Sequence, residues 1–499
     1  MNRRTFLKST IAASLSLHAR TRAQSPGANE DIRVAVIGFN GRGENHIAEY
    51  LQMKGVRIVA LCDVDAKVLD KGRAQLAAKN ANVETFQDIR KLLESKEVDA
   101  ISVATPNHWH SLASIWGCQA GKDVYCEKPV SHSVWEGRQL VKAADVHQRI
   151  VQMGVQSRSG VGLANALAWL KSAPLGKVKY ARALCYKRRD SIGKVEVETE
   201  WPADIDKDLW YGPAEVKPLM RKKLHYDWHW VWNTGNGDLG NQGIHQMDIA
   251  RRFLGEDEMS PAVWAVGGRV GYVDDGETPN SLIVLHDYKT APLIFEVRGL
   301  PAKKDAREMD RYRMSPGVGV HVQYENGYVV CPDYNNAAVY NDKDELLRTF
   351  GDPQVPKEIA KAAEFEAIPS AGGAQAENHF GNFIKAVRSR KVADLHGKII
   401  DGHISSALCH TGNISYRLGQ QTAPDAIREK LKGDADARDS FERLAAHLAA
   451  NEVDISMDKL ALGEFLKMDP KTEKFIGSAA ADKLLTREYR APFVVPENV

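Results

Sequence analysis

The sequence predicts an α/β protein in which a doubly wound parallel sheet comes first and an α+β domain with an open-faced, mainly antiparallel sheet follows. Up to about residue 155, continuous apolar runs alternate with helical patterns, which is typical of buried parallel strands joined by helices. From about Gly160, apolar and polar residues alternate within the runs, which indicates strands with one solvated face. The length of 499 residues also favours two or more domains.

The first segment, residues 1–30, is expected to be an export signal and linker. Arg3 and Arg4 stand just before Phe-Leu-Lys, and this core resembles twin-arginine signals. A short apolar run follows, and a small-residue cleavage site lies near Ala23. We therefore expect export to the periplasm by the twin-arginine machinery. The alternative is a disordered basic tail.

Residues 31–155 contain the strand candidates of the doubly wound sheet. These are "IRVAVIG" (32–38), "VRIVALCDVD" (56–65), "VDAISVATP" (98–106) and "KDVYCEKP" (122–129). Helical patterns lie between them. Sheets of this kind bind ligands outside the carboxyl ends of their strands, so the residues that end these runs are candidates for a site.

The turn after the first strand has the composition of a dinucleotide site. In "GFNGRG", glycines allow a tight turn and a close backbone approach, and the following helix points its N-terminus at a pyrophosphate. Asn40 replaces the usual middle glycine, and asparagine tolerates a positive φ. Asp63 follows about 20 residues later, where an acid meets the ribose hydroxyls and favours NAD over NADP. Arg42 either neutralises a 2′-phosphate or contacts the pyrophosphate. The predicted turn residues are Gly38, Asn40, Gly41, Arg42 and Gly43.

Residues 156–420 are expected to form the second domain, and residues 421–499 a C-terminal extension. The strand candidates include "KVKYARALCYKR" (177–188), "AVWAVGGRVGYV" (262–273) and "NSLIVLHDY" (280–288). Two helical patterns, between residues 376 and 420, come late in this domain.

Composition narrows the function classes. Lys and Arg total 67 and Asp and Glu 65, a balance that argues against nucleic acid or an anionic membrane surface as the main partner. No internal stretch approaches the ~18 apolar residues of a membrane span, so no membrane anchor is expected. The six cysteines mostly lie in apolar runs and are expected to be buried thiols, with a disulfide left open.

"GNQGIHQMDIARRF" (240–253) places a histidine among groups that can take part in proton transfer. At helical spacing Asn241, His245 and Asp248 share one face. Histidine suits general-base work because its ordinary pKa of ~6.5 is near the operating pH. The alternatives are a core histidine paired with Asp248 and a zinc site completed by His225 and His229.

Three further stretches, "ATPNHWH" (104–110), "CEKPVS" (126–131) and "MGVQSRS" (153–159), resemble the Gfo/Idh/MocA family of sugar and polyol oxidoreductases. The resemblance implies a Rossmann domain that binds NAD, with the Glu-Lys-Pro motif beside the nicotinamide. It also implies late helices that pack back on the first domain and assembly as a homodimer or homotetramer through the open sheet. The residues implied to line the nicotinamide half are Thr105, Asn107, His110, Glu127, Lys128 and Gln156.

The same resemblance assigns the chemistry. Lys128 is implied to reach the substrate hydroxyl, and partial burial next to a cationic ring would lower its pKa. Asn241 stands where relatives commonly have a carboxylate, and an amide carries no proton. The predicted catalytic residues are Lys128, His245, Asn241 and Asp248. The predicted substrate contacts are Arg158, Tyr186, Trp230, Asn236, Asn241 and His245.

The sequence therefore predicts an NAD(P)-dependent oxidoreductase acting on a carbohydrate or cyclitol hydroxyl, with no metal. Free NAD is scarce outside the cytoplasm, so the cofactor is expected to stay tightly bound. One alternative is a redox-neutral, NAD-dependent glycosidase that oxidises, eliminates, hydrates and reduces in one cycle. Another is a non-catalytic sugar-binding protein with the same fold.

Overall fold

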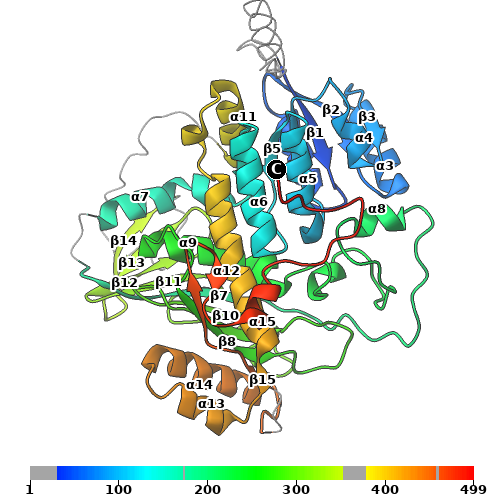
Figure 1. Ribbon diagram of the computed structural model, residues 1–499. Helices are drawn as coiled ribbons and strands as arrows, with labels where there is room; N and C mark the ends of the chain where they lie inside the picture. The colour runs from blue at the N-terminus through cyan, green and yellow to red at the C-terminus, as the bar shows by residue number, and fades with distance from the viewer. Residues whose placement is uncertain (1–30, 172–174, 352–377, 457–459) are drawn as a thin grey trace, which may run out of the picture.

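The computed structural model describes residues 31–171, 175–351, 378–456 and 460–499, so the predicted export signal lies outside the described residues. Two sheets form the protein, one in each half of the chain (Figure 1). In the described part, no helix is long and apolar enough to cross a membrane, and the six cysteines are buried thiols.

The first sheet is parallel throughout, as predicted, with strand order β3-β2-β1-β4-β5-β6. Its central strands are buried on both faces, which explains their continuous apolar runs. The strands are β1 (Ile32–Ile37), β2 (Val56–Cys62), β3 (Glu84–Phe86), β4 (Ala100–Val103), β5 (Asp123–Cys126) and β6 (Val151–Met153). The helices are α2 (Arg42–Leu51), α3 (Ala66–Ala77), α4 (Ile89–Leu93), α5 (Asn107–Gln119) and α6 (Val134–Val146).

The second sheet is antiparallel except where β7 and β10 run parallel, so the predicted fold class is confirmed. Its strands are β7 (Val178–Tyr186), β8 (Ala262–Gly268), β9 (Ser281–His286), β10 (Leu293–Arg298), β11 (Val318–Tyr324), β12 (Gly327–Cys331), β13 (Ala337–Tyr340), β14 (Leu346–Phe350), β15 (Gln420–Gln421), β16 (Ala461–Leu462), β17 (Leu466–Asp469) and β18 (Lys474–Phe475). The helices are α7 (Val161–Leu170), α8 (Lys207–Tyr211), α9 (Ile244–Leu254), α11 (His379–Ser389), α12 (Ile399–Leu418), α13 (Pro424–Lys430), α14 (Ala435–Ala450) and α15 (Ala479–Lys483).

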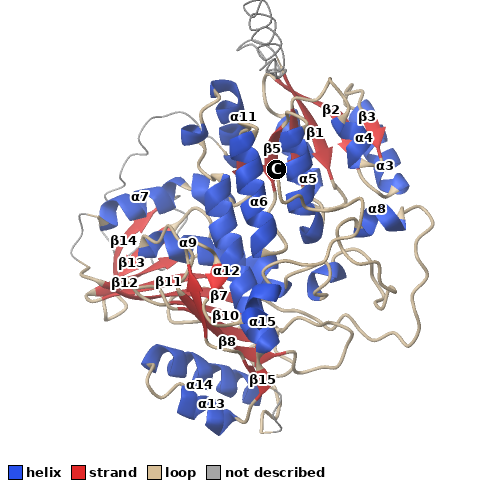
Figure 2. Ribbon diagram, in the orientation of Figure 1, coloured by secondary structure: helices blue, strands red, loops and turns tan. Residues whose placement is uncertain are grey.

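Both faces of this sheet are covered over β8, β9 and β10, which differs from the expected solvated face. Helices α9 and α12 pack on the inner face, and α13 and α14 pack on the outer face (Figure 2). Phe441 and Leu444 of α14 bury their side chains against Ile283 and Ile294 of the sheet. The sequence pattern did not indicate this cover because a C-terminal extension supplies it.

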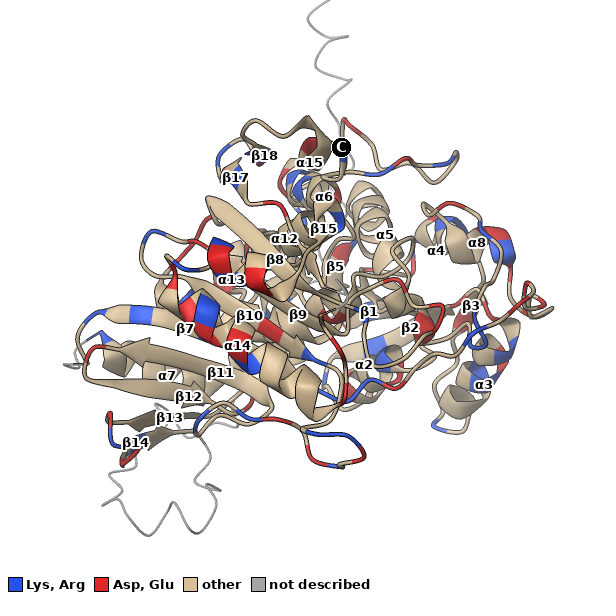
Figure 3. Cartoon of the chain, turned by 90° about the horizontal axis from the view of Figure 1, so that it is seen from below, with Lys and Arg blue, Asp and Glu red and all other residues tan. Residues whose placement is uncertain are grey.

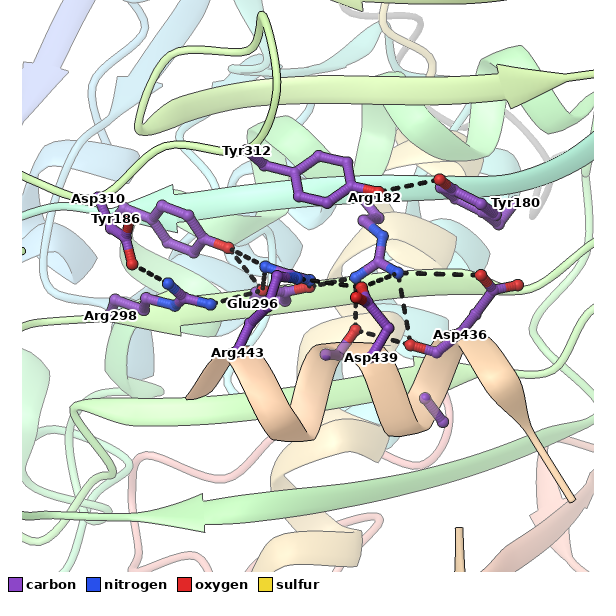
Figure 4. Close-up of polar contacts among 12 residues, drawn as sticks. Tyr180, Arg182, Tyr186, Glu296, Arg298, Asp310, Tyr312, Asp436, Asp439 and Arg443 are labelled. Carbon is purple, nitrogen blue, oxygen red and sulfur yellow. Dashed lines mark hydrogen bonds and ion pairs between the residues drawn. The ribbon is translucent and has the colours of Figure 1, made fainter. Parts of the chain in front are cut away.

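A buried ion-pair network joins α14 to the same outer face (Figure 4). The Glu296 carboxylate on β10 accepts hydrogen bonds from Arg182 at 2.7 Å and from Arg443 of α14 at 2.5 Å. Tyr186 donates to the other oxygen of Glu296 at 2.5 Å. Burial alone would raise the pKa of Glu296, but Arg443 and Arg182 hold it below its ordinary value.

The end of the chain returns to the first domain. Figure 1 shows the C-terminus beside α5, and Phe493 is buried against Trp109 and Trp116 of that helix. Between β7 and α9, residues 199–235, which we call the strap, cross to the first domain. The strap pairs with it through the Asp65–Ile205 bridge and the Ala66 N–H, which donates to the Asp204 carbonyl at 2.9 Å.

Surface charge is mixed. Basic and acidic residues lie side by side on α13 and α14 (Figure 3), where Arg428 pairs with Asp425 and Glu442.

Candidate active site

A cavity of about 380 Å³ lies at the carboxyl ends of β1, β2, β4 and β5, and the strap forms its opposite wall. Its lining includes most of the residues predicted to bind a cofactor. They are Gly38, Asn40, Gly41, Arg42, Asp63, Thr105, Asn107, His110, Glu127 and Lys128, together with Asn241.

The glycine turn forms one end of this cavity, and its glycines have three different structural roles. Gly38 has a φ of 74°, and a Cβ there would stand 2.8 Å from the Thr105 backbone. Gly41 has a φ of 141° and faces open space. A Cβ on Gly43 would meet the Gly38 carbonyl oxygen at 2.2 Å, so this glycine allows the helix to pack closely on the turn. The positive φ values of the turn fall on Gly38 and Gly41, and Asn40, which would tolerate one, does not adopt it.

The N-terminus of α2 is open to a ligand. No side chain caps it, so backbone N–H groups of its first turn face the cavity end without a capping partner. A pyrophosphate fits such a position because the helix dipole and these donors both favour an anion.

Asp63 lies at the next strand end, as predicted. Its carboxylate accepts the Phe39 N–H at 3.0 Å and the Asp65 N–H at 3.1 Å. Burial raises the pKa of Asp63 to about 6. The side chain therefore holds the glycine turn against the second strand while it lines the cavity.

Arg42 points to the other end of the cavity. Its Nε donates to the Glu127 carboxylate at 2.8 Å, so the guanidinium is paired there and not placed beside Asp63. This position does not suit recognition of a ribose 2′-phosphate, which the sequence had left open.

Lys128 follows β5 and is partly buried at that same end. Its Nζ donates to the Asn241 backbone carbonyl at 2.5 Å. Burial lowers the pKa of Lys128, while the adjacent Glu127 carboxylate opposes the shift. A neutral amine therefore becomes accessible at lower pH than for an exposed lysine.

His245 is buried near Lys128 and stacks on Tyr334, with 4.6 Å between the ring centroids. Its Nδ1 has no hydrogen-bond partner among the described residues. Burial and the Lys128 charge lower the pKa of His245 to about 3, well below the ordinary value on which its expected general-base role rested. The ring is neutral and suited to hydrogen bonding, because charging it in this setting is costly.

Asp248 lies three residues after His245 in α9 and keeps the expected helical spacing, whereas Asn241 does not. Residues Leu239–Gly243 form a π-helical turn before α9, and the wider turn moves Asn241 off the expected helical face. Asp248 is buried in polar contacts, accepting from Arg158 at 2.8 Å and from Ser405 at 2.7 Å. The Asp248 carboxylate anchors α9 to α12 and to Arg158, and these contacts give no support to its predicted catalytic role.

The predicted substrate contacts are scattered. Arg158 is committed to Asp248 and Asp401, and Tyr186 to Glu296 on the outer sheet face. Trp230 is buried under Arg189, 5.0 Å from the ring centroid, and Asn236 bonds Asn107 at 3.0 Å. None of these four side chains lines the cavity, so their assignment as substrate contacts stays a prediction.

The remaining predicted cofactor residues include one orphaned polar atom. Thr105 Oγ1 is buried without a partner in the described part of the chain and lines the cavity. His110 bridges the Thr105 and Pro129 carbonyls, at 2.7 and 2.6 Å, and so ties two strand ends together. Gln156 contacts Glu127 at 3.4 Å from outside the cavity.

The strap supplies lining residues that are not among the predicted site residues. His225 and His229 were considered only as ligands of the alternative zinc site. For four of the six residues the available signal was the run "LHYDWHWVW", which is dense in aromatics. These lining residues are Leu209, Trp210, His225, Tyr226, Trp228 and His229.

The alternative zinc site is not assembled. Across residues 31–171, 175–351, 378–456 and 460–499, no group of three or more His, Cys, Asp or Glu side chains is placed to hold a metal ion. His229 stacks on Trp228 with 3.6 Å between centroids, and His225 lies 3.8 Å from Asp65.

Comparison with known families identifies both domains. Residues 32–155 match the GFO_IDH_MocA model, an oxidoreductase family with an NAD-binding Rossmann fold. Residues 170–277 match the model of that family's C-terminal alpha/beta domain. The predicted NAD-binding domain is confirmed.

Individual relatives are more distant. A glycosyl hydrolase family 109 protein of Shewanella sp. (strain W3-18-1) is 29% identical over 178 residues, which cover 31% of this chain and 39% of that protein. The WlbA dehydrogenase of Bordetella pertussis, solved with NADH and UDP-GlcNAcA, aligns with a TM-score of 0.53 at 18% identity over 76% of this chain and 94% of that one. A levoglucosan dehydrogenase, solved with NADH and levoglucosan, aligns with a TM-score of 0.52 at 18% identity over 76% of this chain and 97% of that one. At these identities the structural matches show the fold.

Proposed function

We propose a function from the family to which this chain belongs, the Gfo/Idh/MocA oxidoreductases, whose two domains are carried by residues 32–155 and 170–277. The protein is an NAD-dependent enzyme that acts on a hydroxyl-bearing carbon of a sugar or cyclitol. The observation that carries this proposal is the partly buried Lys128 amine at one end of a cavity whose other end is the glycine turn. The dehydrogenases of similar fold, solved with UDP-GlcNAcA and with levoglucosan, support the substrate class.

The cavity fits a dinucleotide. The open space beside Gly41 and the uncapped start of α2 would hold the pyrophosphate, and Asp63 would accept from the ribose hydroxyls. The Thr105 hydroxyl also lines the cavity. It has no hydrogen-bond partner among the described residues and would be able to bond the cofactor. Bound NAD would supply the acceptor or donor of the hydride.

Lys128 is the better proton acceptor of the two candidate groups. As a neutral amine it takes the proton of the substrate hydroxyl, and as an ammonium it returns one in the reverse direction. The lowered pKa of Lys128 makes the neutral form accessible, whereas the pKa of about 3 for His245 makes that ring a weak base. His245 does not line the cavity, so we assign the substrate proton to Lys128 alone, which the Asn241 carbonyl holds in place.

We also propose that the cofactor stays bound between turnovers. The strap forms one wall of the cavity, and two arginines of the C-terminal tail fasten it. Arg490 donates to the Asp208 carbonyl at 2.5 Å and to the Ala214 carbonyl at 3.1 Å, and Arg487 donates to the Asn233 carbonyl at 2.9 Å. Retention suits a protein exported in folded form, for which the twin-arginine pattern of residues 1–30 is the support.

A redox-neutral glycosidase is the second candidate. It is favoured by the family 109 glycosyl hydrolase relative and by the proposed retention of the cofactor, because such a cycle regenerates its own NAD. Release of a glycosidic leaving group without net NADH would identify it. A non-catalytic sugar-binding role remains the third, and it predicts no turnover of any sugar or glycoside.

The first experiment is mass spectrometry of the denatured, purified protein for NAD or NADP. Retained NAD after extended dialysis supports the proposal, and a chain that binds neither nucleotide when both are supplied overturns it. Assays with free sugars plus NAD, and with nitrophenyl glycosides without added NAD, then separate the dehydrogenase from the glycosidase.

We also propose periplasmic export and assembly as a homodimer or homotetramer. Fractionation of cells making the full chain or its Arg3→Lys, Arg4→Lys form tests periplasmic export, which the double substitution should block. Light scattering tests the homodimer or homotetramer. Because α13 and α14 cover β8 to β10, self-association through the sheet would have to use β11 to β14.

A further inference from the structure

The carboxylate beside the candidate catalytic lysine is held by a buried histidine that the proposed chemistry does not use. We propose that His46 is a positioning residue that keeps the Glu127 carboxylate charged and directed toward Lys128 in the cofactor cavity. This inference rests on the proposed function for its purpose but on contacts of its own for its geometry.

His46 lies one turn into α2, the helix that starts at the glycine turn, and is fully buried. Its Nε2 is 3.1 Å from Glu127 Oε1, and its Nδ1 is 2.9 Å from the Ser102 hydroxyl. Tyr50 in turn donates to the Ser102 oxygen at 3.2 Å.

These contacts have one consistent direction. A carboxylate only accepts, so Nε2 carries the proton and donates to Glu127. The neutral ring then accepts at Nδ1 from Ser102, whose oxygen accepts from Tyr50. In the chain Tyr50–Ser102–His46–Glu127, each group therefore donates a hydrogen bond to the next one, and the last acceptor is the carboxylate. This arrangement fixes the histidine tautomer.

Glu127 receives three further donors, one of which is Gln156 Nε2, at 3.4 Å from Oε1. Arg42 Nε donates to Oε1 at 2.8 Å, and the Lys128 backbone N–H donates to Oε2 at 3.3 Å. The carboxylate thus connects the helix of the glycine turn to the strand end that carries the lysine.

The charges around this carboxylate explain why a histidine suits the position. Burial would raise the pKa of Glu127, but the His46 hydrogen bond and the Arg42 charge keep it well below its ordinary value. Burial lowers the pKa of His46, so the ring donates without adding a second positive charge. Other titratable groups lie close enough to interact electrostatically with Glu127, Lys128 or His46. They are Glu49, Tyr50, Tyr125, Cys126, His110, Lys187, His245, Tyr334, His379 and Cys409.

An ionised Glu127 should favour the positively charged NAD⁺ over NADH. The quantity to measure is the ratio of the dissociation constants for NADH and NAD⁺, from about pH 4 to pH 9. This measurement needs no substrate turnover. In the native chain Glu127 stays charged over most of this range, and the ratio is flat. As pH falls through the pKa of Glu127, its charge is lost and the preference for NAD⁺ declines.

His46→Leu removes one hydrogen bond to a charged group, which should raise the acid midpoint of this ratio by about 1 to 2 pH units. His46→Gln retains an N–H donor near the Nε2 position and should restore a flatter profile. His321→Leu is the matched control, since His321 is equally buried but lies on the second sheet beside Gln323. It should reduce thermal stability while leaving the ratio unchanged.

A His46→Leu profile that overlays the native one in a folded chain overturns the proposal, as does identical behaviour of the Leu and Gln variants. If His46→Leu does not fold, Ser102→Ala removes only the hydroxyl that fixes the tautomer. It should shift the midpoint in the same direction by less, and an unshifted midpoint contradicts the proposal. If the variants show these shifts but the native protein turns over no sugar, the positioning role of His46 stands and only the proposed function is refuted.

Discussion

The fastening of the strap by the C-terminal tail makes a quantitative prediction about cofactor release. Replacing Arg490 by alanine removes an ion pair to the Asp208 carboxylate and hydrogen bonds to two carbonyls of the strap. The strap keeps its bridge to Asp65 and its bond to Ala66, so the variant should fold with the strap less firmly closed.

The magnitude follows from the exposure of these contacts. The Asp208 side chain is 63% exposed, so its ion pair contributes at most about 1 kcal/mol. The two bonds to carbonyls contribute about 1 kcal/mol each after exchange with water. A loss of about 2 kcal/mol corresponds to about 30-fold in the population of the open strap. If opening limits release, the dissociation rate of bound NADH rises by about 10- to 30-fold.

The assay loads the full chain with NADH and dilutes it into excess NAD⁺, following the loss of enhanced NADH fluorescence. Arg428→Ala is the matched control, because this arginine also makes a partly exposed ion pair, but its partners Asp425 and Glu442 lie on α13 and α14 and not on the strap. Its release rate should equal that of the native chain. An Arg490→Ala chain that folds and releases NADH at the native rate would refute the idea that the strap retains the cofactor.

Three other predictions follow from the site and the fold. Activity in the oxidation direction should rise with pH through the pKa of Lys128, because the neutral amine accepts the proton. Since burial lowers that pKa, the inflection in kcat/KM should fall below the ordinary lysine value of about 10.4, and an inflection at or above it would contradict the assignment. Asp63→Ser should weaken NAD binding by about 10-fold or more and narrow the preference over NADP, as measured by titration with both nucleotides; an unchanged preference would place the ribose elsewhere. Glu296→Gln should lower the free energy of unfolding by about 3 kcal/mol in denaturant titrations, because it leaves buried arginines without their anion. The pKa of Glu296 is depressed in the folded state, so its contribution is complete above the unfolded pKa of about 4.3 and declines as pH falls below it; a variant as stable as the native chain would contradict this.

The sequence was most informative where a local pattern has one structural solution. The strand-turn-helix at Gly38–Gly43 could be predicted because only glycine fits the positions the turn requires. The place of Asp63 could be predicted because it ends the second strand, about 20 residues after the turn. The exception, Asn40, shows that a tolerated conformation is not a required one: the chain uses Gly41 for it.

Other features depend on contacts that no local pattern contains. The π-helical turn changes the face of Asn241 by inserting one residue into the helical repeat, which a 3.6-residue period does not reveal. Asp248 stands three residues after His245, a spacing that suggested a shared role in proton transfer. Its hydrogen-bond partner Arg158 is 90 residues away in the sequence. The cover over β8 to β10 and the strap both come from segments outside the motifs, and their partners are distant in the sequence.

The most direct test of the account is a single-turnover comparison of the native chain with Lys128→Ala, both loaded with NAD and mixed with a panel of sugars and glycosides. The near-ultraviolet absorbance of reduced nicotinamide is followed. The account predicts that at least one carbohydrate reduces the bound NAD in the native chain, steadily for a dehydrogenase or transiently for a redox-neutral enzyme. In Lys128→Ala the rate should fall by about 100-fold or more, with NAD still bound. Undiminished reduction in Lys128→Ala, or no reduction by any carbohydrate in the native chain, would contradict it.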